Sequence, residues 1–131
     1  MMVFAQDINI GETVVTRSNE AYVFTFYLDG IIVSEAAMWL QGKDEFVPVQ
    51  YVAISSVKTI EKFRRHGYME KLFYYMFEYA VEYLEVDVAL LSVEKTNFSA
   101  YNLYSKIGFE VLSEHPLDDD YWVMTKDLFE G

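Results

Sequence analysis

The sequence predicts an α/β domain in which helices flank one mixed sheet. Short runs of aromatic and β-branched residues fill the first half of the chain, and turn residues separate them, as is typical of strands. The second half contains two segments whose apolar residues recur every three or four positions, as is typical of helices that cover a sheet. The order strands, helix, strand, helix, strands therefore predicts a mixed sheet with helices against it.

The expected strands of the first half follow one another closely. Ala21–Leu28 is rich in aromatic and β-branched residues, and Asp29-Gly30, a dipeptide that favours a tight hairpin turn, follows it. The other segments of this half are a short strand at Val14–Arg17, the returning strand Ile31–Trp39, a polar turn at Gln41–Glu45 and an extended run at Phe46–Ile60 with room for a bulge or a bend.

Two helices are expected in the second half. Gly67–Glu85 has one wide apolar stripe, and Asn97–Ile107 begins with a good N-cap residue and is followed by Gly108, where a helix-ending glycine is expected. The remaining segments are a buried strand at Asp87–Val93 and two final strands at Phe109–Ser113 and Tyr121–Lys126, joined by Glu114–Asp120.

Length and composition limit the class of protein. The 131 residues, with 53% hydrophobic and 24% charged residues, predict a single globular domain over residues 1–131. No apolar run approaches the roughly 20 residues that span a membrane, and no signal peptide is recognised, so we expect a cytoplasmic protein without a membrane partner. Without cysteine there is no disulfide, thiolate metal site or cysteine nucleophile. The net charge of -11 disfavours nucleic acid and would attract cations, although acidity also serves solubility.

A basic turn, Arg64–Met69, precedes the first helix and is the first candidate site. The first amides of a helix have no partners within the helix, and the helix dipole adds a partial positive charge there. Arg64, Arg65 and His66 add further positive charge, and Gly67 permits close approach of a ligand. The turn is thus suited to pyrophosphate. Taken alone, the same pattern is also common on protein surfaces.

The second candidate is Tyr104, which lies two helical turns after Asn97 on the same helix face. A phenol beside a departing thiolate can donate a proton as a general acid. A tyrosine that simply packs its ring in the core is the usual alternative.

Both candidates fit one family. The pattern Asn-x-x-Ala-x-x-Leu-Tyr-x-Lys-x-Gly-Phe of the GNAT superfamily of N-acyltransferases is matched in full by Asn97, Ala100, Leu103, Tyr104, Lys106, Gly108 and Phe109. The Arg-x-x-Gly-x-Gly/Ala turn of that family is matched at Arg64 and Gly67, with Met69 at its last position. Residues 50 to 128 resemble the family. The resemblance implies a GNAT fold and an acetyl-CoA-dependent N-acetyltransferase without a metal.

The resemblance also implies roles for particular residues. The backbone of Val57 and Thr59 would pair with the pantetheine arm, Asn97 would contact that arm or orient its helix, and Tyr104 would protonate the CoA thiolate. The pyrophosphate would be held by the turn after Arg64, through the amides of Arg65, His66, Gly67, Tyr68, Met69 and Glu70. A primary amine, on a cationic small molecule or a peptide or protein, would attack the thioester directly.

Two departures from the family pattern leave an alternative open. Met69 stands where the family prefers Gly or Ala, so its side chain must point away from the ligand. Ser92 stands where some members have a glutamate base, and a serine is not a base at neutral pH. Glu35 and Glu94 are substitutes by proximity only, and water, or a substrate amine that arrives already neutral, is equally suitable. These departures favour the alternative of a non-catalytic acyl-CoA-binding regulatory or interaction protein.

The remaining features concern the acceptor and the assembly. About 20 residues precede Ala21, where the family has a strand and two helices, so we expect a shortened N-terminal helical region and a cleft that is open or closed by a second subunit.

Asp118–Asp120 is a solvated turn or an acidic lip for a cationic acceptor. The row of Tyr75, Tyr79 and Tyr83 is an interface or part of the core, and we expect a homodimer. His66 and His115 show no metal-ligand spacing.

Overall fold

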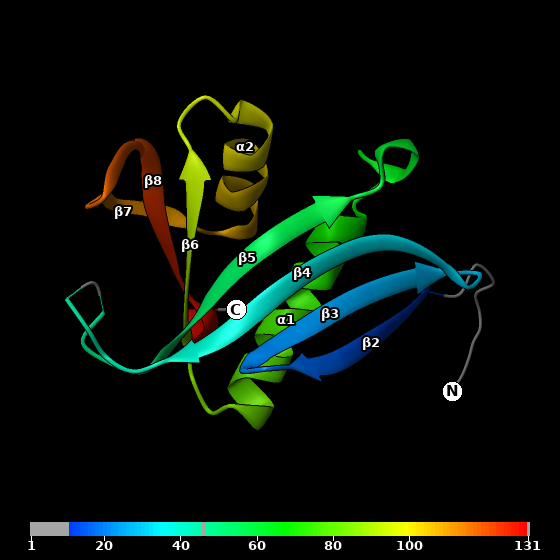
Figure 1. Cartoon of the computed structure of the whole chain (residues 1–131), viewed down its shortest axis with the longest axis horizontal. Coiled ribbons are helices and arrows are strands. Elements are labelled where there is room, and N and C mark those ends of the chain that lie inside the picture. The colour runs from blue at the N-terminus through cyan, green and yellow to red at the C-terminus, as the bar shows by residue number, and fades with distance from the viewer. Residues whose placement is uncertain (1–10, 46, 131) are drawn as a thin grey trace.

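The computed structural model describes residues 11–45 and 47–130, which form a seven-stranded sheet and two α-helices (Figure 1). The sheet order is β2-β3-β4-β5-β6-β8-β7, and every neighbouring pair is antiparallel except the parallel pair β5 and β6. The elements are β2 (Gly11–Ser18), β3 (Ala21–Leu28), β4 (Ile31–Gln41), β5 (Tyr51–Thr59), η1 (Glu61–Phe63), α1 (Tyr68–Tyr83), β6 (Val88–Glu94), α2 (Phe98–Ile107), β7 (Glu110–His115), β8 (Asp118–Asp127) and η2 (Leu128–Glu130).

The first three strands form consecutive hairpins. β2 is longer than the predicted Val14–Arg17 and pairs with β3 along its whole length. Asn19, with φ 57°, lies in the turn between them, and the predicted Asp29-Gly30 turn joins β3 to β4. Within the described residues no α-helix precedes α1.

The extended run predicted for Phe46–Ile60 is too long. Phe46 lies outside the described residues, and β5 begins only at Tyr51. The preceding loop is closed on itself, because Asp44 N donates to Val47 O at 2.9 Å and Val47 N donates to Asp44 Oδ1 at 3.2 Å. These bonds occupy backbone groups that a strand would have used.

The predicted bulge is present in β5. Glu35 of β4 pairs with Lys58, but Ala37 pairs with Ser55, so β5 has one extra residue in this interval. Ser56 has φ 55°, a left-handed conformation that is uncommon for a residue with a side chain.

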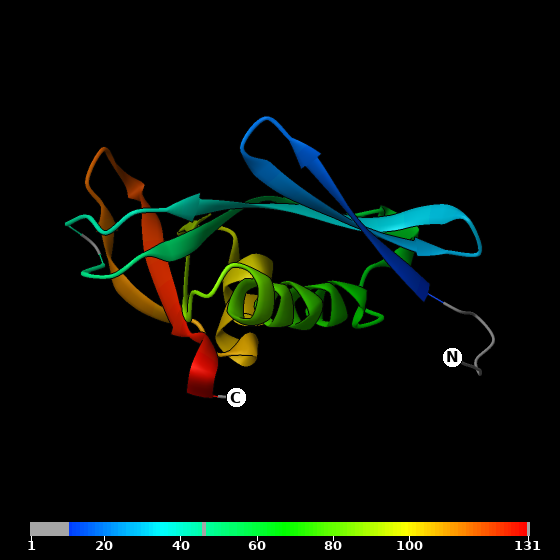
Figure 2. The ribbon, with the colours of Figure 1, turned by 90° about the horizontal axis from the view of Figure 1, so that it is seen from below.

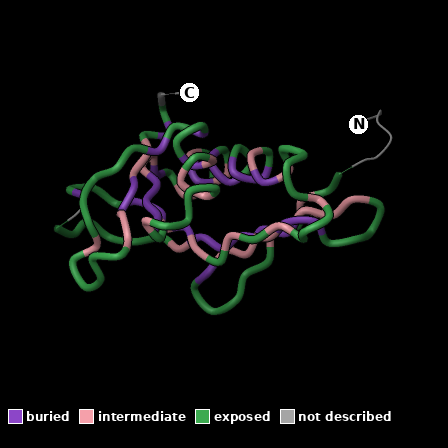
Figure 3. Tube along the Cα trace, turned by 90° about the horizontal axis from the view of Figure 1, so that it is seen from above, coloured by how far each residue is buried: buried purple, intermediate pink, exposed green. Residues whose placement is uncertain are grey.

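Both helices lie on the same face of the sheet, as Figure 2 shows. Their apolar stripes share one core with the strands, and Phe24, Phe73, Met38, Leu72 and Met76 are its largest fully buried side chains. Figure 3 shows the buried segments where helices and sheet face each other. No described helix is long and apolar enough to cross a membrane.

The tyrosine row on α1 consists of Tyr75, Tyr79 and Tyr83, and it lies partly in the core between the helices and the sheet. Tyr79 contacts Phe24 edge-on, with ring centroids 5.2 Å apart, and it lies 5.6 Å from Tyr22 of β3. Tyr83 is 70% exposed. The core interpretation therefore holds for Tyr79, and the predicted homodimer stays a prediction.

The predicted connection Glu114–Asp120 is also wrong. β7 and β8 continue through most of it, His115 pairs with Asp118, and only Pro116 and Leu117 form the turn. Asp118–Asp120 therefore begins a strand instead of lying in a loop. Its three exposed carboxylates each have an oxygen within 4.8 Å of the others.

Candidate active site

The basic turn places unpaired amides in front of α1. Gly67 has φ 79°, a left-handed conformation that suits glycine, and it is the N-cap of α1. The first bond of the helix runs from Lys71 N to Gly67 O at 3.1 Å, and no side chain caps the helix. The amides that precede Lys71 are thus free to bind an anion. A Cβ atom built on Gly67 would meet no atom within 4 Å, so the space before these amides is open.

Two side chains of the turn hold its shape. Arg64 Nε donates to Thr59 O at 3.1 Å. His66 Nδ1 lies 2.8 Å from Arg64 O and 3.1 Å from Phe63 O, so it carries a proton and donates to these carbonyl oxygens. The imidazole also stacks on Tyr68, with centroids 5.6 Å apart. The His66 side chain therefore bonds to the turn itself and stabilises it.

The helix α2 is bounded at both ends by its own sequence. Asn97 Oδ1 accepts from Ala100 N at 3.2 Å, as an N-cap does. At the other end Gly108 has φ 119°, Gly108 N donates to Ser105 O, and Phe109 N donates to Tyr104 O at 2.9 Å. This is the bonding of a Schellman motif, in which the residue after the glycine packs back on the last turn.

That motif places Tyr104. Its ring lies 6.1 Å from the ring of Phe109 and 5.7 Å from that of Phe73, measured between centroids, and its exposure is 7%. Burial raises the pKa of the Tyr104 phenol to about 12. The phenol therefore stays protonated at neutral pH, as a proton donor must.

The turn and α2 face one cavity of about 640 Å³. Every site residue predicted from the sequence lines it except His66. The lining residues are Val57, Lys58, Thr59, Phe63, Arg64, Arg65, Gly67, Tyr68, Met69, Glu70, Asn97, Ser99, Ala100, Leu103, Tyr104 and Lys106. We call this space the inner cavity.

Met69 does not fill the inner cavity. Its side chain is 7% exposed and packs in the main core, as predicted for a side chain that must point away. The departure from Gly or Ala at this position therefore leaves the amides accessible.

A second cavity of about 430 Å³, the outer cavity, opens where β5 and β6 separate. These strands pair only from Val52 with Ala89 to Ile54 with Leu91. Beyond Ile54 the side of β5 that faces β6 is unpaired, so the backbone near Val57 is available to an extended ligand. The outer cavity is lined by Ala53, Ile54, Ser55, Ser56, Val57, Leu90, Leu91, Ser92, Val93, Glu94, Asn97, Ala100, Tyr104 and Tyr121.

The two cavities share Val57, Asn97, Ala100 and Tyr104. Tyr104 thus lies at their junction. Of the carboxylates considered as bases, Glu94 lines the outer cavity and Glu35 lines neither. Glu35 instead accepts from Thr25 Oγ1 at 3.3 Å and lies 3.7 Å from Lys58 Nζ. Ser92 also faces the outer cavity.

Sequence reasoning missed several lining residues. Ser55 and Ser56 lie at the bulge, and Tyr121 comes from β8, where it pairs with Glu94. Tyr121 reaches the cavity only through pairing of strands distant in sequence, and no local pattern marks it. Lys106 was visible in the α2 pattern, but its place at the inner cavity was not.

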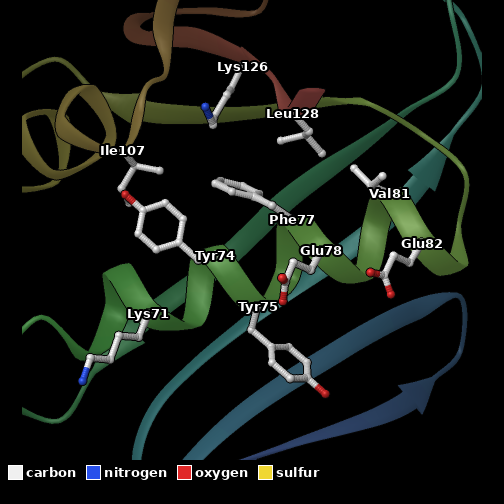
Figure 4. Close-up of a pocket in the computed structure, with 10 residues that line it drawn as sticks. All are labelled: Lys71, Tyr74, Tyr75, Phe77, Glu78, Val81, Glu82, Ile107, Lys126 and Leu128. Carbon is white, nitrogen blue, oxygen red and sulfur yellow. The ribbon is translucent and has the colours of Figure 1, made fainter. Parts of the chain in front are cut away.

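A third cavity, of about 680 Å³, lies between α1 and the ends of α2 and β8 (Figure 4). It contains none of the predicted site residues, and its walls include Tyr74, Phe77, Ile107 and Leu128.

The comparisons agree with this geometry. The Acetyltransferase (GNAT) family profile matches residues 5–109, so the chain belongs to this family. No curated protein matches the sequence significantly. The fold, the acetyltransferase class and the acetyl-CoA co-substrate predicted from the sequence are thereby confirmed at the level of the family.

Solved structures show the same fold. One is the N-acetyltransferase PseH of Campylobacter jejuni in complex with acetyl coenzyme A, with 19% identity, a TM-score of 0.63, and coverage of 84% of this chain and 70% of that one. A GNAT-family acetyltransferase of Streptococcus pneumoniae has 18% identity, a TM-score of 0.67 and coverage of 84% and 68%. An aminoglycoside N(6')acetyltransferase of Legionella pneumophila has 16% identity, a TM-score of 0.67 and coverage of 86% and 66%.

Proposed function

We propose that this protein transfers the acetyl group of acetyl-CoA to a cationic primary amine. The observation that supports this most is the position of Tyr104 at the junction of the two cavities. The inner cavity offers free helix amides and basic side chains to a pyrophosphate, and the outer cavity offers a carboxylate to an amine. Tyr104 is the only titratable side chain among the described residues that lines both.

In the proposed binding mode, the amides from Arg65 to Glu70 hold the pyrophosphate. His66 contributes through its backbone, because its ring is engaged with the turn. The pantetheine arm runs along the unpaired side of β5 near Val57 and Thr59. The thioester then lies near Tyr104, where the two cavities meet.

The proposed reaction is a direct attack. The neutral amine nitrogen attacks the thioester carbonyl carbon, and the tetrahedral adduct then breaks its carbon–sulfur bond. The leaving thiolate takes the phenolic proton of Tyr104, and the nitrogen loses one proton. The proton lost by the nitrogen finally returns to the Tyr104 phenolate. Amine and acetyl-CoA therefore give amide and CoA without net change in the enzyme. Before the attack, Glu94 or water takes the proton of the incoming ammonium and releases it to the solvent.

The cationic acceptor is inferred from the charge around the outer cavity. Among the described residues Glu94 is the only charged one that lines this cavity, and Asp118–Asp120 directly precedes Tyr121 in β8. One structure with the same fold is named an aminoglycoside N(6')acetyltransferase, which makes aminoglycosides a first class to test, beside polyamines and basic peptides.

The first experiment is calorimetric titration with acetyl-CoA and CoA, followed by an amine screen that measures CoA release. Binding with turnover supports the proposal, and binding without turnover on any amine class would favour the non-catalytic alternative. Absence of binding would contradict both the proposed transferase and the non-catalytic alternative.

Replacing Asp118, Asp119 and Asp120 by Asn should raise the acceptor KM and weaken its salt dependence. An unchanged KM would show that these three carboxylates do not attract the acceptor.

A further inference from the structure

The inner cavity contains an acidic residue where an anion is expected to bind. Glu70 is the third residue of α1, inside the first turn. Its carboxylate would repel a pyrophosphate held by the amides of that turn. A glutamate at this position also commonly reaches back to the N-cap amide and occupies it, as in a capping box.

Among the described residues no side chain caps α1, so Glu70 does not close a capping box. Its carboxylate instead has two partners, one on α2 and one a helical turn further along α1. Lys106 Nζ of α2 lies 3.3 Å from Glu70 Oε1, and Tyr74 OH donates to Glu70 Oε2 at 3.1 Å. Figure 4 shows the Tyr74 ring pointing from α1 towards Ile107 at the end of α2.

We propose that Lys106 and Tyr74 are positioning residues that hold the Glu70 carboxylate away from the first-turn amides of α1. This inference rests on the proposed binding of CoA. The ion pair partly neutralises the carboxylate, and the hydrogen bond fixes its direction. The amides of Gly67, Tyr68 and Met69 therefore remain open for an anionic ligand. The contact between Lys106 of α2 and Glu70 of α1 thus keeps the inner cavity available to the ligand.

Affinity for CoA tests this inference through Glu70. Lys106→Met should release the carboxylate to the amides and weaken CoA binding about fivefold, the effect of one cap interaction. Tyr74→Phe removes no charge and should weaken binding about twofold. The Lys106 side chain is 70% exposed and Tyr74 is 46% exposed, so the variants should fold. Lys71→Met is the matched control, because Lys71 is exposed and does not line the inner cavity.

The decisive comparison repeats both substitutions with Glu70→Ala. If Lys106 and Tyr74 act through Glu70, their effects on the CoA dissociation constant should fall below about 1.5-fold in that background. If Lys106 instead contacts the ligand directly, Lys106→Met weakens binding equally in both backgrounds, and the inference is overturned.

A readout without ligand separates this inference from the proposed function. In the Lys106→Met/Tyr74→Phe variant, the amide resonances of Gly67 and Tyr68 should shift from their positions in the unmodified protein, because the carboxylate reaches these amides. Adding Glu70→Ala to the double variant should abolish that shift. Absence of the shift in the double variant would overturn the inference. Failure of CoA to bind the unmodified protein would overturn the proposed function and leave this measurement decisive for Glu70.

Discussion

The two cavities that meet at Tyr104 are built in different ways. Backbone amides and short local contacts define the ligand-binding end of the inner cavity, around Gly67 and Arg64. Side chains from three strands define the outer cavity, among them Ser92, Glu94 and Tyr121. A site made of backbone amides tolerates substitutions that preserve the turn. In a site made of side chains, each substitution alters the groups that contact the ligand. We therefore expect CoA binding to be robust and acceptor choice to be easily altered.

The largest effect is expected at the junction. Tyr104→Phe removes the proposed proton donor and should lower kcat about 100-fold, because general acid catalysis contributes on the order of that factor. The dissociation constant of acetyl-CoA should change less than about twofold. Steady-state kinetics and calorimetry together measure this. An unchanged kcat would exclude Tyr104 from the mechanism.

The same residue predicts a pH dependence. The pKa of the Tyr104 phenol is raised from 10 to about 12 by burial, so the protonated form persists as pH rises. The rate should therefore show no decline due to Tyr104 between about pH 7 and 10, once amine protonation is accounted for. A decline with an apparent pKa near 10 that Tyr104→Phe abolishes would contradict the assigned environment.

The next effect concerns the backbone of the inner cavity. Gly67→Val forces a β-branched residue into the left-handed conformation and turns the first amides, so the affinity for CoA should fall more than about tenfold. Gly30→Val is the matched control, because Gly30 has φ 80°, also has open space around it and lies in the β3–β4 turn. Equal CoA binding in both variants would show that the turn is not the ligand site.

A smaller effect is expected in the outer cavity. Glu94→Gln removes the one charged side chain among the described residues that line this cavity. It should raise the KM of a cationic amine about fivefold, while the dissociation constant of CoA stays constant. Glu110→Gln, an exposed substitution on β7 away from both cavities, controls for the loss of one negative charge. If the two variants have the same KM, net charge and not the position of Glu94 governs the acceptor.

The smallest effect concerns the scaffold of α2. Asn97→Ala removes the cap bond to Ala100 N and should cost about 1 kcal/mol, which corresponds to a fall in Tm of roughly 3–6 °C. Asn102→Ala, at an exposed position within the same helix, should not lower Tm. Thermal unfolding of the two variants measures the difference, and an equal Tm would mean that the cap bond contributes nothing.

Local patterns explain why much of this site was predictable. In α2, the N-cap Asn97, the buried Tyr104 and the Gly108-Phe109 ending each follow from contacts within a few residues. The bounds of β3, α1 and α2 were predicted to within two residues for the same reason. The errors at Phe46–Ile60 and Glu114–Asp120 arose where a side chain or strand pairing overrode local preference.

The sequence by itself determined the hairpins, both helices, the free amides after Gly67 and the burial of one tyrosine on α2, because each depends on neighbours along the chain. Only the tertiary structure decided that β5 and β6 separate after Ile54, that Glu94 and Tyr121 border the resulting opening, and that Lys106 reaches Glu70. These contacts join strands and helices distant in sequence. Packing of the whole sheet sets their distances, and no local spacing encodes them.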